Sequence, residues 1–376
     1  MKQHEKIFIE LLRAGMWNRR PEIPKDFTNW AAVASLAKGQ SVFAVVANVL
    51  LTNPEISQKL DADLKSKIKR LALSHMHSHT LLNKAVVDVV STLRSNGVEP
   101  ILLKGQGLAR YYLQPDLRQC GDIDLYVGCE NALRTHEILA PVAQKIDDVS
   151  RVNSGIHFDV TMERGVEVEV HRFTELPPLK RQKRIYEAAS AKGLYCNTVA
   201  LDFAGTPVLT PSDDFNAFYI FSHLFNHFLT SGIGLRQFCD WMMFLHARKD
   251  YLDHVYLKNL LEDMDLLKPW QAFGCLLVQE LGLPEDEFPL YDGVHSKNVR
   301  RIMTRVLNEG NFGKEKALYK LKNQNEKTLF NKLITFVIYV SRSFSFVFVF
   351  PKATLNHFAG PFANAARRIL FRFKHK

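Results

Sequence analysis

Residues 100–127 constrain the fold of this chain more than any other stretch. An apolar run ends in a Lys-Gly pair within residues 101–105, and strict alternation of apolar and polar residues follows at 122–127. Alternation predicts a strand whose apolar residues share one face, which leaves Asp122 and Asp124 together on the other. Two such carboxylates repel each other unless a cation lies between them, and oxygen ligands favour Mg²⁺. The stretch therefore predicts a magnesium site, with a solvated strand edge as the alternative.

The motif LLKG…R…GDIDLYV resembles the nucleotidyltransferase signature of the DNA polymerase β-like superfamily. Within that superfamily the resemblance is strongest to a bacterial family described as uncharacterised nucleotidyltransferase. It implies a strand, a glycine turn that holds a triphosphate, a helix, and a second strand whose acids hold Mg²⁺. Two features depart from the pattern: the usual Gly-Ser or Gly-Gly pair is Gly105-Gln106, and the gap from Gly105 to Asp122 is longer.

A β-hairpin is predicted at 155–173, because both arms alternate with period two around a turn at 163–165. The superfamily takes its third carboxylate from such a strand, in a pattern of an acid, an apolar residue and a histidine. Glu169-Val170-His171 matches this pattern, and the resemblance assigns Glu169 to the metal and His171 to the nucleotide site. Glu167 and Asp159 are the alternative carboxylates. An exposed hairpin face that carries glutamates without function is the other interpretation.

Two predicted helices beyond residue 210 carry a second group of polar residues. Ser212 is the expected N-cap of the first helix, on which His223 and His227 lie one turn apart. That spacing suits a zinc pair, but the acid of an HExxH metalloprotease is absent, so these histidines are expected to face the cleft. The next helix carries Arg236 and Asp240, which can simply pair with each other. The resemblance implies that all four contribute to nucleotide binding.

The glycine turn supplies the remaining expected contacts with the nucleotide. Backbone N–H groups of Gly105 and Gln106 at a helix N-terminus suit a triphosphate. Lys104 and Arg118 are candidate partners of the phosphates.

The chain of 376 residues is long enough for several domains, and we expect an α+β fold. A small mixed sheet would form the nucleotidyltransferase core, flanked by N-terminal and C-terminal helical regions. The expected divisions are an N-terminal helical region (1–96), the core (97–205), a helical domain that closes on the active site (206–290) and a basic C-terminal region (291–376). Five scattered cysteines without a Cys-x-x-Cys pair argue against a disulfide framework and fit a reducing cytoplasm.

The C-terminal part carries the chain's excess of positive charge. Residues 301–376 hold 15 Lys and Arg against 3 Asp and Glu, a net charge of +12. Because the whole chain has a net charge of +10, residues 1–300 carry about −2. The apolar run 333–350 contains Arg342, which makes a membrane span improbable. The basic, amphipathic segment 360–376 predicts peripheral contact with an anionic membrane or simply a solvated helix.

The expected function is Mg²⁺-dependent transfer of an NMP from an NTP, ATP by preference, to the hydroxyl of an unidentified acceptor. Two Mg²⁺ ions held by Asp122, Asp124 and Glu169 would stabilise the attacking and leaving oxygens. The acceptor is open among a small molecule, a sugar and a protein. Two alternatives remain: a catalytically inert relative that binds a nucleotide or a partner, and an RNA-modifying transferase, which ranks lower because no aromatic-basic motif for RNA is present.

Overall fold

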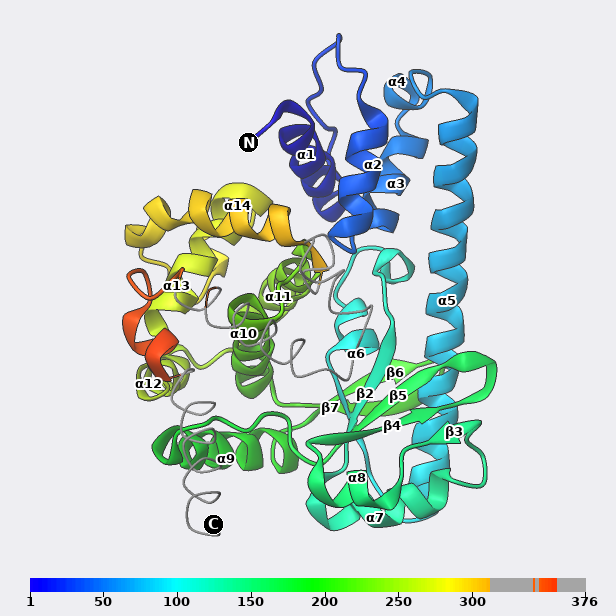
Figure 1. Cartoon of the computed structure of the whole chain (residues 1–376), viewed down its shortest axis with the longest axis vertical. Coiled ribbons are helices and arrows are strands. Elements are labelled where there is room, and N and C mark those ends of the chain that lie inside the picture. Colours follow the sequence, from blue (N-terminus) through cyan, green and yellow to red (C-terminus); the bar gives the residue numbers. More distant parts are fainter. Residues whose placement is uncertain (312–340, 342–344, 357–376) are drawn as a thin grey trace, which may run out of the picture.

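The computed structural model describes residues 1–311, 341 and 345–356. Its architecture is α+β, as predicted: a mixed seven-stranded sheet is flanked by N-terminal helices, most of them above it in Figure 1, and by C-terminal helices beside it. The apolar run 333–350 lies mostly outside the described residues, and the basic segment 360–376 lies entirely outside them. Within the described part, no helix combines the length and apolar character needed to cross a membrane.

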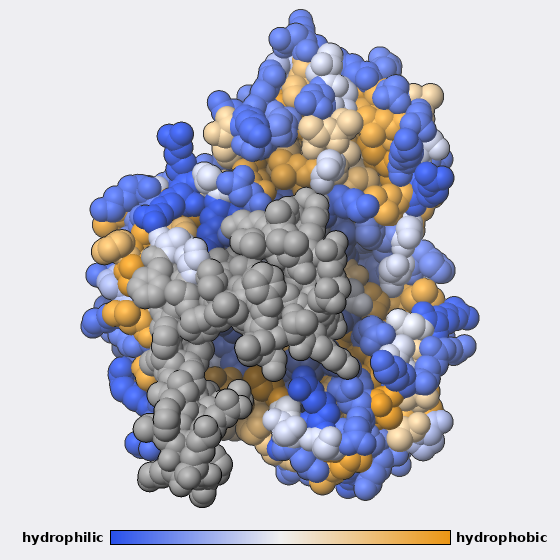
Figure 2. Space-filling model, in the orientation of Figure 1, coloured by the Kyte–Doolittle hydropathy of each residue, from blue (hydrophilic) through white to orange (hydrophobic). Residues whose placement is uncertain are grey.

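The N-terminal region is helical, as predicted. It comprises α1 (Gln3–Trp17), α2 (Trp30–Gly39), α3 (Phe43–Thr52), α4 (Pro54–Ser57) and the 34-residue α5 (Ala62–Ser95). The Asp61 carboxylate caps α5 by accepting a hydrogen bond from Leu64 N at 2.8 Å, and the helix ends before Gly97, which has a φ of +75°. At 1.5 Å per residue α5 is about 50 Å long, and it connects the helical region to the sheet (Figure 1). On the visible face, hydrophobic residues gather over the N-terminal helices (Figure 2).

The sheet has the order β3-β4-β5-β2-β1-β7-β6. Its strands are β1 (Ile101–Leu103), β2 (Asp122–Tyr126), β3 (Lys145–Ile146), β4 (His157–Thr161), β5 (Glu167–His171), β6 (Val199–Phe203) and β7 (Thr206–Thr210). The strands β2 and β5 run parallel, as do β1 and β7, whereas the other neighbours are antiparallel. The predicted hairpin is therefore β4–β5, with its turn at Glu163–Gly165.

The sheet extends beyond the core that the sequence indicated. The sequence predicts a surface connection with a charged helix over residues 172–205, and α9 (Lys180–Tyr195) is that helix. The same stretch also contains β6, which pairs with β7 across Ala204 and Gly205. The expected boundary at 205/206 thus falls in the turn of a hairpin, and the sheet continues to Thr210.

The two faces of the sheet meet different partners. On one face Ile123, Leu125 and Val127 join Val168 and Val170 in a core with α5, α7 (Gly128–Leu139) and α8 (Val149–Ser154). The predicted alternation is confirmed there. The other face packs, together with α6 (Gly105–Ala109), in a larger core with the helices that follow the sheet. Because the carboxylates of β2 and β5 lie on this second face, they are directed towards those helices.

The C-terminal helices lie on the side of this second face, and the first two of them are nearest the sheet (Figure 1). They are α10 (Asp213–Thr230), α11 (Leu235–Arg248), α12 (His254–Asp263), α13 (Leu267–Leu276) and α14 (Val299–Glu309). Ser212 is the N-cap residue of α10, as expected, although its side chain makes no capping hydrogen bond. Short turns also occur: 3₁₀ turns at Pro115–Leu117 (η1), Glu163–Gly165, Lys249–Tyr251, Glu285–Glu287 and Val294–Asn298, and a π turn at Leu277–Leu281. Residues 351–356 are also helical.

Candidate functional site

A cleft of about 480 Å³ lies between the polar face of the sheet and helices α10 and α11. Twelve residues were singled out from the sequence, and eleven of them line this cleft. They are Lys104, Gly105, Arg118, Asp122, Asp124, Glu169, His171, His223, His227, Arg236 and Asp240. The cleft therefore brings together residues from four separate stretches of the chain. Gln106 is the exception.

The strand register places the carboxylates side by side. Asp124 pairs with Glu169 across the parallel strands β2 and β5, and Asp122 lies two residues before Asp124. The Nε2 atom of His171 connects them, at 2.9 Å from Asp124 Oδ1 and 3.4 Å from Glu169 Oε2. Both oxygens thus lie within hydrogen-bonding reach of one nitrogen, as expected for side chains that converge on one point.

Asp124 is buried and has two cationic partners. Besides His171, the Lys104 Nζ lies 3.3 Å from Asp124 Oδ1. Burial alone would raise the pKa of Asp124, but Lys104 and the hydrogen bond from His171 hold it well below its usual range. Burial would lower the pKa of His171, yet the contacts of this ring with Asp124 and Glu169 raise it. The Asp124 carboxylate is therefore ionised, and Lys104 and His171 compensate its charge.

The other two carboxylates behave differently. Burial, together with the like charges of Asp124 and Glu169, raises the pKa of Asp122. The hydrogen bond from His171 lowers the pKa of Glu169 in spite of its burial. Of the three carboxylates, Asp122 therefore has the least compensated negative charge. A bound cation would be stabilised most strongly beside it.

The turn after β1 aims Lys104 into the cleft. Lys104 and Gly105 have φ values of 41° and 40°, in the left-handed region that a residue with a side chain adopts only at a cost of about 1–3 kcal/mol. Lys104 Nζ contacts Asp124 and lies 3.4 Å from His223 Nε2. Such strain at a cleft-lining residue is typical of functional sites.

Gln106 points away from the cleft. Its side chain is fully buried and donates to Asn83 Oδ1 at 2.6 Å and to the His79 carbonyl at 3.3 Å, both on α5. The departure from the Gly-Ser pair thus has a structural role: the longer side chain fixes the turn to α5.

The histidines of α10 lie one turn apart and face the cleft, as the spacing predicted. Burial and the charge of Lys104 lower the pKa of His223 well below its usual value and that of His227 to about 4. His227 Nδ1 lies 2.7 Å from Ser231 Oγ. Both rings are therefore neutral at physiological pH and offer hydrogen bonds without adding positive charge.

The expected pairing of Arg236 with Asp240 is wrong. Arg118 donates two hydrogen bonds of 2.8 Å to the Asp240 carboxylate, which also accepts one of 2.7 Å from the Tyr112 hydroxyl. Arg236 instead donates to the Gln119 carbonyl at 3.1 Å. Sequence spacing favoured the local pair, whereas the fold brings a distant arginine to Asp240.

Two residues of the cleft were missed or undervalued in the sequence. Glu175 lies in the stretch that read as a surface connection, but it lines the cleft and accepts a hydrogen bond of 2.6 Å from Ser222. Burial raises the pKa of Glu175 to about 7. His157, which alternation places on the same face as Asp159, lines the cleft as well, and its ring centroid lies 5.1 Å from that of His171. Alternation at 157–171 could have pointed to His157; no sequence signal marked Glu175.

The alternative third carboxylates lie outside the converged group. Glu167 is exposed and accepts hydrogen bonds of 3.1 Å from Thr161. Asp159 is exposed and lies 3.5 Å from His157 Nε2.

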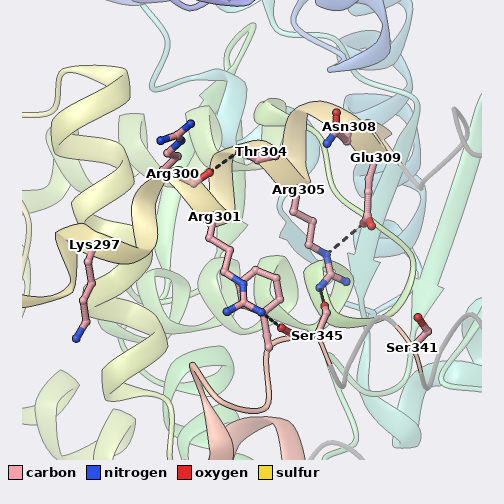
Figure 3. A pocket seen from close by; sticks show the side chains of 10 residues that line it. Lys297, Arg300, Arg301, Thr304, Arg305, Asn308, Glu309, Ser341 and Ser345 are labelled. Carbon is pink, nitrogen blue, oxygen red and sulfur yellow. Dashed lines mark hydrogen bonds and ion pairs between the residues drawn. The ribbon is translucent and has the colours of Figure 1, made fainter. Parts of the chain in front are cut away.

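A second cavity, of about 610 Å³, lies beside α14 and is rich in arginine (Figure 3). Arg305 donates to Ser345 Oγ at 2.8 Å and lies 3.4 Å from Glu309, while Arg301 donates to the Ser345 carbonyl. The side chains of Lys297 and Arg300 point away from these groups (Figure 3). These cations do not converge on one point, so the cleft at the sheet remains the candidate site.

Comparisons with known proteins show the family of the chain. No curated protein matches the chain. A crystal structure of an antigenic nucleotidyltransferase-like protein from Paracoccidioides brasiliensis is similar at 12% identity over 54% of this chain and 92% of that chain, with a TM-score of 0.33. The family described as "Uncharacterised nucleotidyltransferase" matches residues 26–282, which is more than half of the chain and includes every residue of the cleft. The chain therefore belongs to this nucleotidyltransferase family.

Proposed function

We propose that the chain is a Mg²⁺-dependent nucleotidyltransferase that moves an NMP from an NTP, with ATP as the preferred substrate, to an acceptor hydroxyl. The observation that carries the proposal is the convergence of Asp122, Asp124 and Glu169 in a cleft that also contains Lys104 and Arg236. Adjacent carboxylates beside cationic side chains are the combination that binds a metal–triphosphate complex.

The donor set fits Mg²⁺. All three carboxylates belong to two neighbouring strands, and the raised pKa of Asp122 marks a site of uncompensated negative charge. Bound Mg²⁺ would polarise the α-phosphate and stabilise charge on the attacking and leaving oxygens. Asp122, Asp124 and Glu169 are the residues that would hold it.

The phosphates have cationic partners on both walls of the cleft, Lys104 beside the strands and Arg236 on α11. Arg236 lines the cleft, and its Nε–H is buried without a hydrogen-bond partner among the described residues. A buried unpaired donor costs free energy that an anionic ligand recovers. We assign Arg236 and Lys104 to the phosphates, and Arg118 to the support of the α11 wall through Asp240.

In the transfer step, the acceptor oxygen forms a bond to the α-phosphorus while the bond between that phosphorus and the oxygen of the β-phosphate breaks. Pyrophosphate leaves with the electron pair. Glu169, ionised and beside the metal position, accepts the proton of the hydroxyl. Lys104 and Arg236 neutralise charge on the departing pyrophosphate.

Calorimetric titration with ATP, with and without Mg²⁺, tests binding, and incubation with α-labelled ATP and candidate acceptors tests transfer. We expect Mg²⁺-dependent binding that Asp122→Asn and Asp124→Asn weaken at least tenfold. The exposed Asp263, on α12, supplies the control Asp263→Asn, which should bind as the wild type does. Binding without transfer to any acceptor would identify an inert relative, and no Mg²⁺-dependent nucleotide binding would refute the proposal.

A further inference from the structure

His157, Glu169 and His171 converge at one point of the cleft. His157 and His171 are direct partners across the antiparallel strands β4 and β5, so their side chains share a face. Glu169 lies two residues before His171 on that same face. One ligand atom from each lies within 4.8 Å of the other two. Two strands of a sheet, and not a loop, therefore hold this group together.

The atoms that face one another are metal ligands. The Glu169 Oε2 lies 3.4 Å from His171 Nε2 and 4.0 Å from His157 Nδ1. Ligands bound at about 2.0–2.2 Å from one ion lie roughly 3–4 Å apart. His171 Nε2 also lies 2.9 Å from Asp124 Oδ1, so metal binding would replace the proton in that hydrogen bond. With this exchange, small side-chain adjustments bring all three atoms into the coordination sphere of a single ion.

The surroundings of His157 also support a role as a metal ligand. The Nε2 of its ring lies 3.5 Å from the Asp159 carboxylate, on the side opposite to the nitrogen that faces Glu169. A carboxylate behind an imidazole that faces a metal is the usual second partner of a ligating histidine, since it fixes the orientation of the ring. In this arrangement the exposed Asp159 has a role that the transfer chemistry does not require.

The donor set differs from that of the magnesium position. Two imidazole nitrogens and one carboxylate favour Zn²⁺ and related transition metals, whereas Mg²⁺ prefers oxygen ligands. We propose that His157, Glu169 and His171 form a binding site for a divalent transition metal, with Zn²⁺ the best match. This site shares Glu169 with the proposed nucleotidyltransferase centre, but binding at it does not depend on the transfer reaction.

The experiment uses the full chain stripped of metal with EDTA and titrated with ZnCl₂ by calorimetry in 5 mM MgCl₂. We expect one Zn²⁺ per chain that excess Mg²⁺ does not displace, and at least a tenfold loss of affinity in His157→Asn. His157 is partly exposed, so this variant should fold; a thermal melt checks that it does. Asp159→Asn should weaken binding by a smaller factor.

His77→Asn is the matched control, because His77 is exposed and belongs to the separate run His75, His77 and His79 on α5. It should bind Zn²⁺ as the wild type does. The proposal fails if His157→Asn retains wild-type affinity, if Mg²⁺ displaces the ion, or if His77→Asn is the variant that loses it. Asp122→Asn separates the two proposals: it should weaken Mg²⁺-dependent ATP binding and leave Zn²⁺ binding intact.

Discussion

At the scale of single residues, Asp122 and Asp124 look equivalent in the sequence but differ in the fold. Alternation places both on one face, and like-charge repulsion alone predicts that Asp124→Asn leaves stability unchanged or raised. The contacts instead predict this result for Asp122. Lys104 and His171 contact Asp124 directly, whereas burial and the neighbouring carboxylates outweigh the more distant cations at Asp122. The difference comes from partners 20 and 47 positions away, which no local pattern reveals.

Thermal melts at pH 7 in EDTA should separate the two aspartates. The pKa of Asp124 is lowered in the fold, so its ionised form stabilises the protein at neutral pH and loses this effect as the pH falls. Asp124→Asn should therefore reduce the free energy of unfolding by about 1–3 kcal/mol. The pKa of Asp122 is raised, so Asp122→Asn should leave the melting temperature unchanged or raise it. Equal losses from both substitutions would contradict this assignment.

Glu175 should make stability depend on pH in the opposite sense to a paired carboxylate. Burial raises its pKa to about 7 from 4.5, so the folded chain holds a proton that the unfolded chain has lost. Stability from this group is present below about pH 4.5 and is lost as the pH rises through about 7. The difference of about 2.5 units corresponds to on the order of 3 kcal/mol.

Glu175→Gln, which keeps the hydrogen bond with Ser222 possible, should therefore flatten the loss of stability between pH 5 and pH 8. Lys104, His223, Tyr186 and Tyr219 face or surround this carboxylate and also influence its titration. Urea unfolding of both proteins across this range, with Glu163→Gln in the exposed hairpin turn as control, measures the effect. A wild-type slope in Glu175→Gln would show that Glu175 titrates normally.

At the scale of elements, local patterns predicted most of the helices and strands but not every partner. Period-two alternation identified β2, β4 and β5, and apolar spacing identified the helices of residues 5–96. The hairpin β6–β7 was not predicted, because Pro207 lies inside β7 and short apolar stretches alternate poorly there. Pairing of Arg118 with Asp240 spans 122 positions, so the i,i+4 rule favoured the wrong arginine.

The junction of α5 and α6 depends on one side chain. Gln106→Ala should leave the His79 carbonyl and Asn83 without their donor and reduce the free energy of unfolding by about 1–3 kcal/mol. Gln106→Ser, which restores the pair usual in the superfamily, should cost a similar amount because serine is too short to reach α5. Gln114→Ala, at an exposed position, is the control. Chemical denaturation measures all three, and a Gln106→Ser variant of wild-type stability would refute the anchoring role.

At the scale of the whole molecule, the sheet and the C-terminal helices meet across a buried ion pair. Arg118, next to η1, and Asp240, on α11, are 5% and 3% exposed, and Tyr112 adds a third member. The larger hydrophobic core continues across the same boundary. The two parts of the chain that form the walls of the cleft are therefore joined by this ion pair and by a shared apolar core.

Breaking this pair should cost far more than breaking an exposed one. Asp240→Asn leaves a buried guanidinium without its counter-charge, which should reduce the free energy of unfolding by roughly 3–5 kcal/mol. The exposed pair Arg181–Asp263 is the control, where Asp263→Asn should change it by about 0–1 kcal/mol. Arg118→Met combined with Asp240→Leu should cost less than the sum of the single substitutions, because no buried charge is then left unpaired. Additive losses in this double-mutant cycle would mean that Arg118 and Asp240 contribute independently, and that their ion pair does not link the two walls of the cleft.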